Sequence, residues 1–447
     1  MYKYVFERSV DIMVKKLIAC VLSALLMLVM SGCDALMFNA DELLTAPKLE
    51  GDMHPVQKAL EDSVKGDITL KYPDSGEYRS AFVVKDIDGS GSEEAFAFYS
   101  TTEDSTVTMH INAIENIGGE WKSHGDLSIV GNGVESVSFA DLDGDKRLEV
   151  IVGWYVFGTT EKQVGIYTYD KNVLKQRAIE HYTNFILADL TSDTTDDLVI
   201  IYLNTTEKVA SAKLLSLSNK GITEVGITSL DGGVNSYSEP VLSTLTDGTP
   251  ALYIDAVKGS GMLTEIIWYK DSELRGIYNP DAPEDSKTYR NGTVASRDYD
   301  LNGIIDIPLS EILISTEQMA DSDKVYYTNW TEFSGNEFIL RSSAFMNYSD
   351  GYSITVPYEL KQNLLVIRKL ESRTRFFYHY DKDEKLVCGE LFRIVTVPLA
   401  EYDYEVFAKN GYSSLGRNEG LVYLTKVSEE TNILTVDYVK SMFDILK

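Results

Sequence analysis

The feature that most constrains the fold of this chain is a segment that recurs along its sequence. In each copy an apolar run leads into an aspartate-rich nonapeptide, and a second apolar run follows. The copies are Phe82 to Tyr99, Val137 to Trp154, Phe185 to Tyr202 and Val294 to Ile312. Their first aspartates, Asp86, Asp141, Asp189 and Asp298, are 55, 48 and 109 residues apart. Because the last interval is about two repeats long, we expect a degenerate copy near Thr244, where threonines replace the aspartates.

Oxygen-bearing side chains stand at positions 1, 3, 5 and 9 of each nonapeptide. The first loop offers Asp86, Asp88, Ser90 and Glu94, and the second offers Asp141, Asp143, Asp145 and Glu149. The third offers Asp189, Thr191, Asp193 and Asp197, and the last offers Asp298, Asp300, Asn302 and Asp306. Calcium takes about six to eight oxygen ligands, and alternate residues of a tight loop can direct several oxygens to one point. The spacing therefore predicts structural Ca²⁺ in at least one loop.

The loops differ in how well they suit this metal. The second has four carboxylates and is the best candidate, whereas Thr191 makes the third the weakest. Gly89, Gly144 and Gly303 stand where the backbone must turn sharply. An EF-hand would need a helix on each side, but these flanks are strand-like.

A calcium loop between two strands resembles the FG-GAP or VCBS repeat of integrin α-subunit propellers and bacterial surface proteins. The resemblance covers residues 68–343, where each repeat has room for four strands. It implies a mainly β fold with a five-bladed β-propeller, or a six-bladed one if the N-terminal segment contributes strands. The metal residues listed above would then be clips within the blades.

The N-terminus has the pattern of an export signal. Lys15 and Lys16 precede an apolar run that ends at Met30-Ser31-Gly32-Cys33, and this ending resembles the lipobox of bacterial lipoproteins. We expect residues 1–32 to be a signal peptide and Cys33 to carry the lipid. Residues 33–67 would form a tether and a short helix near 55–64. The protein would then be extracytoplasmic and lipid-anchored to the cell membrane.

A different composition begins near residue 344 and predicts a small α/β domain over 344–447. The expected strands are Tyr352–Val356, Leu364–Arg368, Arg373–Tyr380, Lys385–Val397, Glu405–Lys409 and Gly420–Lys426, and Val436–Leu446 is expected to be helical. The order of these elements is similar to the PsbP-like class of small domains, without a specific motif. Such a similarity assigns no function.

The net charge and the motif content limit the classes of function that this chain can have. The net charge of −28 argues against a nucleic-acid partner. No zinc spacing, nucleophile elbow, Walker loop or dinucleotide fingerprint stands in suitable context. We therefore expect a non-enzymatic, calcium-stabilised binding or scaffold module for a protein or glycan. The alternative is a propeller glycoside hydrolase with paired carboxylates near the central channel.

Overall fold

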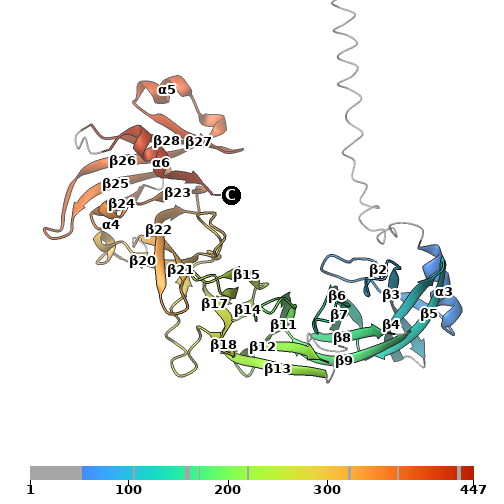
Figure 1. Ribbon diagram of the computed structural model, residues 1–447. Helices are drawn as coiled ribbons and strands as arrows, with labels where there is room; N and C mark the ends of the chain where they lie inside the picture. Colours follow the sequence, from blue (N-terminus) through green and yellow to red (C-terminus); the bar gives the residue numbers. More distant parts are fainter. Residues whose placement is uncertain are drawn as a thin grey trace, which may run out of the picture. The chain divides into compact units, whose positions relative to one another are not determined.

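The computed structural model describes residues 53–103, 106–156, 162–170, 172–218, 221–320, 324–369, 372–429 and 434–446 (Figure 1). The expected signal peptide, the lipidated Cys33 and most of the tether lie outside these residues. The described part begins with helix α3 (His54–Ser63), where the sequence predicts a short helix. Among the described residues, no helix combines the length and apolar character needed to cross a membrane.

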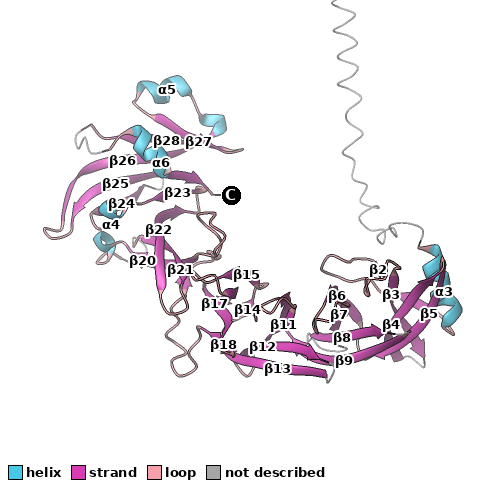
Figure 2. Ribbon diagram, in the orientation of Figure 1, coloured by secondary structure: helices cyan, strands magenta, loops and turns pink. Residues whose placement is uncertain are grey.

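Antiparallel β-sheets dominate the rest of the described chain (Figure 2). The first sheet contains β1 (Ile68–Leu70), β2 (Phe82–Lys85), β3 (Glu94–Glu103), β4 (Thr106–Ile117) and β5 (Glu120–Ile129). The second contains β6 (Gly133–Ala140), β7 (Glu149–Tyr155), β8 (Lys162–Asp170) and β9 (Val173–Tyr182). The third contains β10 (Asn184–Ala188), β11 (Asp197–Asn204), β12 (Val209–Ser218) and β13 (Gly221–Leu230). In the second and third sheets, strands adjacent in sequence are adjacent in space, as the repeat predicts.

The fourth sheet contains β14 (Ser236–Tyr237), β15 (Val241–Thr244), β16 (Pro250–Lys258), β17 (Gly261–Lys270), β18 (Glu273–Gly276) and β19 (Arg290–Asn291). It holds the degenerate repeat, because β15 pairs with β16 across the turn that replaces the acidic loop. The fifth sheet contains β20 (Ile307–Ile312), β21 (Tyr326–Phe333), β22 (Phe338–Asn347), β23 (Tyr352–Thr355) and β29 (Phe443–Ile445). The 3₁₀ helix η2 (Ile314–Thr316) follows β20.

The sixth sheet has the strand order β24 (Leu364–Lys369), β25 (Thr374–Asp381), β26 (Leu386–Pro398), β28 (Leu421–Val427), β27 (Ser413–Arg417). Around it the chain forms α4 (Tyr358–Lys361), η5 (Leu399–Glu401), α5 (Tyr404–Lys409) and α6 (Val436–Met442). The expected domain boundary at 343/344 falls inside β22, and the C-terminal strand β29 pairs with β23 of the fifth sheet. The expected strand Glu405–Lys409 is helical. The Asp403 side chain caps the N-terminus of α5 by accepting hydrogen bonds from the backbone N–H groups of Glu405 and Val406.

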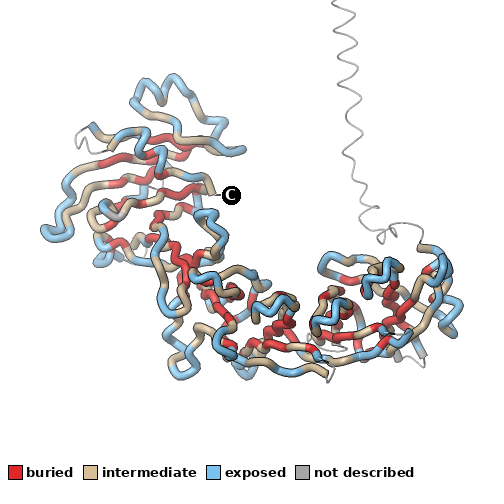
Figure 3. The backbone as a smooth tube through the Cα atoms, viewed as in Figure 1, coloured by how far each residue is buried: buried red, intermediate tan, exposed pale blue. Residues whose placement is uncertain are grey.

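Burial explains the apolar runs of the repeat. β7 and β11 are buried along most of their length, since each has sheet neighbours and a packed layer on both faces. The last strands of the same sheets, β9 and β13, expose many residues. Figure 3 shows the buried residues concentrated in the inner strands.

Hydrophobic clusters join each sheet to the next one along the chain. Phe98 of the first sheet lies 6.0 Å from Trp154 of the second, between ring centroids. Further clusters join the second sheet to the third and the third to the fourth. Trp268 and Phe333 are 5.5 Å apart between the fourth and fifth sheets. The described part of the protein is therefore mainly β, with repeated blade-like sheets, and closure of these sheets into a propeller stays a prediction.

Candidate metal centres

The four acidic nonapeptides connect to their flanking backbone in the same way. The residue before position 1 pairs with the residue at position 9. The pairs are Lys85 with Glu94, Ala140 with Glu149, Ala188 with Asp197, and Arg297 with Asp306. Each position-9 carboxylate therefore lies at the base of its loop, beside the residue where the loop begins.

The strand expected before the last loop is reduced to this single bridge between Arg297 and Asp306. Side chains bind the backbone groups that a strand would have paired. Ser296 donates its N–H to Asp255 at 2.8 Å, and the Arg290 Nε donates to the Val294 carbonyl at 2.5 Å. The side chains of Asp255 and Arg290 thus replace a sheet neighbour at this point.

Three hydrogen bonds recur in all four loops. The position-9 carboxylate accepts from the backbone N–H of position 2 at 2.8–3.1 Å. The position-1 aspartate accepts from the N–H of position 6 at 2.8–3.0 Å. The position-5 side chain accepts from the N–H of position 7 at 2.8–3.2 Å. The sequence proposes position 5 as a ligand, namely Ser90, Asp145, Asp193 and Asn302, but the structure turns these side chains to the loop backbone.

The backbone at positions 4 and 6 is left-handed in every loop. Gly89 and Gly144 occupy position 4 with φ of +68° and +73°, and Gly303 occupies position 6 with φ of +91°. These glycines stand at sharp turns, as the sequence predicts. Other loops place larger residues there, such as Leu301 with φ of +63° and Lys146 with φ of +71°. Because L residues rarely adopt this region, the loop geometry is retained against a local conformational cost.

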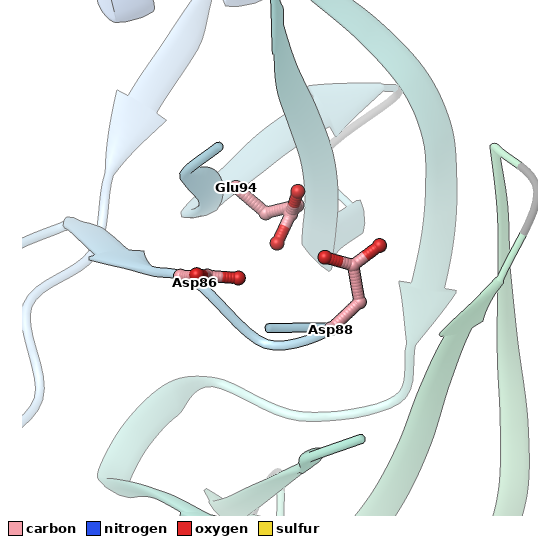
Figure 4. A group of neighbouring side chains, drawn as sticks. All are labelled: Asp86, Asp88 and Glu94. Atoms are coloured by element: carbon pink, nitrogen blue, oxygen red, sulfur yellow. The ribbon is translucent and has the colours of Figure 1, made fainter. Parts of the chain in front are cut away.

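Three of the four loops gather their carboxylates at positions 1, 3 and 9. In each group, one oxygen from every residue lies within 4.8 Å of the others. The groups are Asp86, Asp88 and Glu94; Asp141, Asp143 and Glu149; and Asp298, Asp300 and Asp306. Figure 4 shows the first group, with Asp86 and Asp88 on the loop and Glu94 facing them. Three convergent carboxylates are a hard-oxygen donor set of the kind that Ca²⁺ prefers.

The third loop does not form such a group among the described residues. Thr191 donates hydrogen bonds to Asp197 Oδ2 from its hydroxyl at 3.1 Å and from its backbone N–H at 3.0 Å. Leu190 donates to the same oxygen at 3.0 Å. A hydroxyl donor thus takes the place that a carboxylate and its cation would occupy, which agrees with the sequence ranking of this loop as the weakest.

Burial of the position-9 carboxylates makes their negative charge unfavourable. Glu149 is 3% exposed and Asp306 is fully buried. Loss of solvation is the main cause that raises the pKa of Glu149 to about 7 and that of Asp306 to about 6, and neighbouring loop aspartates add to both shifts. Burial likewise raises the pKa of Glu94. A bound cation would stabilise the ionised form of each of these groups.

Two buried carboxylate oxygens without a hydrogen-bond partner also indicate cation binding at these loops. Asp306 Oδ1 in the last loop and Asp86 Oδ1 in the first are buried and accept no hydrogen bond from any described residue. A buried carboxylate oxygen without a partner costs free energy, and a metal ion would remove that cost. The residues at these loops therefore fit Ca²⁺.

The degenerate repeat uses an ion pair in place of an acidic loop. Asp247 Oδ2 accepts from Lys270 Nζ at 2.8 Å. This hydrogen bond, together with those from Thr249, lowers the pKa of Asp247 to about 2. Among the described residues, this turn holds no group of three convergent carboxylates.

A carboxylate pair lies outside the loops and was missed by the sequence reasoning. Glu265 accepts a 2.8 Å hydrogen bond from the Asp231 N–H, and Asp231 Oδ2 accepts from Lys258 Nζ at 2.7 Å. Burial raises the pKa of Glu265 to about 7. The pair lines a cavity of about 20 Å³, which has room for one water and not for a sugar ring. This pair therefore provides no substrate site for the glycosidase alternative.

Comparison with known proteins identifies no family, since neither a family model nor a curated protein matches the chain. Among solved structures, a rhamnogalacturonan lyase from Bacillus licheniformis aligns with 58% of this chain and 66% of its own, at 11% identity and a TM-score of 0.30. A second rhamnogalacturonan lyase aligns over 72% of both chains, at 11% identity and a TM-score of 0.28. The periplasmic gluconolactonase of Pseudomonas aeruginosa aligns with 72% of this chain and 94% of its own, at 9% identity and a TM-score of 0.26.

These neighbours correct one expectation. The sequence led us to expect a protein without enzymatic activity, whereas the three aligned solved structures are two rhamnogalacturonan lyases and a gluconolactonase. The non-enzymatic assignment is therefore withdrawn. At these TM-scores the likeness assigns no activity or substrate to this chain.

Proposed function

We propose that this chain is a lipid-anchored, extracytoplasmic module whose blade-like sheets are stabilised by calcium and arranged as a propeller. The observation that carries the proposal is the equivalence of three loops, each with three carboxylates within 4.8 Å. Because the loops repeat with the sheets, their role is structural. The partner, a protein or a glycan, stays a prediction of the sequence.

Calcium would act by tying the two ends of a loop together. In the second loop, for example, Asp141 follows β6 and Glu149 begins β7. One ion bound to both would neutralise part of the negative charge of the loop and hold the strand pair in register. Calcium concentrations outside the cytoplasm suit modest-affinity sites of this kind, with dissociation constants of about 10⁻⁴–10⁻³ M.

The metal count is the direct test of these sites. We expect residues 34–447, dialysed against calcium at pH 7.5, to bind about three Ca²⁺ ions per chain, because three loops gather carboxylates. Equilibrium dialysis followed by elemental analysis gives the number. A count of zero would mean that the acidic loops are only turns.

Calcium affinity should depend on pH in a defined direction. The protonated carboxyl group is a poor ligand, and in the metal-free protein burial raises the pKa of Glu149 to about 7 and that of Asp306 to about 6. Calcium affinity should therefore fall as the pH is lowered from 7.5 to 5.5. An affinity that does not change over this range would argue against position 9 as a ligand.

The lipid anchor is tested at Cys33. We expect the full chain to fractionate with membranes and Cys33→Ser to be released into the soluble fraction, because the thiol is the acylation site of the lipobox-like segment. Cys388→Ser is the matched control, since it removes an exposed thiol that lies outside the lipobox-like sequence. Equal membrane association of the wild type and Cys33→Ser would refute the anchor.

A further inference from the structure

Three arginines line one cavity in the C-terminal part of this acidic chain. The cavity has a volume of about 210 Å³ and is lined by Ser349, Asp350, Arg368, Arg373 and Arg375. The first two residues belong to the turn between β22 and β23, and the arginines belong to β24, β25 and the residue before β25. A net charge of −28 makes a local excess of positive charge notable, because it is not a general property of this surface.

The sheet register places two of these arginines directly opposite each other. Arg368 of β24 pairs with Arg375 of β25, so both side chains project from the same face. Like charges in directly opposed cross-strand positions destabilise a sheet. Arg373 adds a second local cost, because its φ of +44° is unfavourable for a residue with a side chain. Two unfavourable features at one place, the opposed arginines and the left-handed backbone of Arg373, indicate a functional constraint.

One carboxylate partly compensates this charge. Asp350 Oδ1 accepts from Arg373 Nε at 2.8 Å and lies 2.7 Å from its Nη2. The other oxygen of Asp350 accepts from Asn347 Nδ2 at 3.0 Å. Asp350 therefore holds Arg373 in place, and its two oxygens are already engaged.

Arg375 has no such partner. It is only 7% exposed, and its guanidinium makes no hydrogen bond or ion pair with any described residue. Burial is the main cause that lowers its pKa from the ordinary value for arginine, and Arg368 adds to this shift, whereas Tyr352 and the carboxylate of Asp350 oppose it. A buried, unpaired guanidinium is costly, whereas one that faces a cavity can bind an anion that enters it.

We propose that Arg368, Arg373 and Arg375 bind an oxyanion, the phosphate or carboxylate group of a small solute. Guanidinium groups present paired N–H donors that match the oxygens of both groups. Ser349 also lines the cavity, but its hydroxyl donates to Asn347 Oδ1 at 2.8 Å. The volume of 210 Å³ is several times the roughly 30 Å³ that a water occupies, so the cavity has room for an anionic group with several attached atoms. This site is independent of the calcium loops.

The test is calorimetric titration of the full chain in detergent at constant ionic strength, with chloride as the balancing anion. Sulfate serves as the tetrahedral probe because it does not precipitate calcium at millimolar concentration, and acetate serves as the carboxylate probe. We expect one ion to bind per chain. The probe that binds more tightly identifies whether the natural ligand carries a phosphate-like or a carboxylate group.

Three variants locate the site. Arg368→Gln and Arg375→Gln should each weaken binding of the better probe about tenfold or more, as expected for loss of a charge-assisted hydrogen bond. Lys369→Gln removes the same charge one residue away, where strand alternation directs the side chain to the other face, and should change binding less than about twofold. Arg368 is exposed, so its variant tests the site even if Arg375→Gln fails to fold. Absence of binding by both probes, or equal losses in Lys369→Gln and Arg368→Gln, would overturn the proposal.

Discussion

Replacing Asp141 and Asp143 together by alanine should lower the melting temperature of the chain by several degrees in calcium and change it much less in a chelator. These residues supply two of the three convergent carboxylates of the second loop. A ligand that binds only the native state stabilises it by mass action, by about 2.7 kcal/mol at a concentration 100 times its dissociation constant. The double variant loses this contribution only when calcium is present.

The reason for this difference lies in the metal-free loop. Without a cation, Asp143 faces Asp141, Asp145 and the buried Glu149, and burial together with the Asp145 charge raises its pKa. Alanine at these positions removes that repulsion and also removes the hydrogen bonds that Asp141 accepts from Gly144 and Lys146. In chelator, the relief of repulsion and the loss of these hydrogen bonds oppose each other. In calcium, the variant also loses the stabilisation that the bound ion gives to the wild type.

The third loop provides the matched control. Asp189→Ala with Asp193→Ala removes the turn hydrogen bonds of positions 1 and 5 from a loop that gathers no three-carboxylate group. This variant should lose the same stability in calcium and in chelator. Thermal unfolding followed by circular dichroism measures the loss of stability of each double variant, relative to the wild type, in calcium and in chelator. If the second-loop variant also loses equal stability in both, its aspartates act only in the turn.

Thr191→Asp should add about one calcium ion to each chain. The third loop has the same backbone, with the position-9 Asp197 accepting from Leu190 and the position-1 Asp189 accepting from Thr194. It differs from the other loops at position 3, where the Thr191 hydroxyl donates to Asp197. A carboxylate at this position supplies the missing oxygen donor, so the count should rise from about three to about four.

The stability of the Thr191→Asp variant should depend strongly on the metal. In chelator the new carboxylate faces Asp197, which is 2% exposed and whose pKa is already raised by burial, so the variant should be less stable than the wild type. Calcium should reverse this loss. Thr191→Val is the control, because it removes the hydroxyl without adding a ligand and should leave the count unchanged. A count that stays at three in Thr191→Asp would show that the loops are not equivalent.

Local sequence determined the strand pairs and three of the acidic loops. A nine-residue loop closes between two adjacent strands, so the spacing of Asp86, Asp88 and Glu94 already places their oxygens near one point. The apolar composition of β7 and β11 likewise predicts buried strands. Thr191 also shows that a single change of side-chain type was readable, because a hydroxyl donates where a carboxylate can only accept.

The tertiary structure decided what depends on residues distant in sequence or on competition between local patterns. At position 5 of each loop, the structure adds a hydrogen bond from the N–H of position 7, which the spacing of the oxygen-bearing residues does not reveal. Asp231 and Glu265 meet only because their strands pack in neighbouring sheets. Arg368 and Arg375 face each other through a strand register that the spacing of the arginines does not reveal. Likewise, β29 pairs with β23 of the fifth sheet, although the two strands are far apart in the sequence. Their backbone groups become hydrogen-bond partners only when the chain folds.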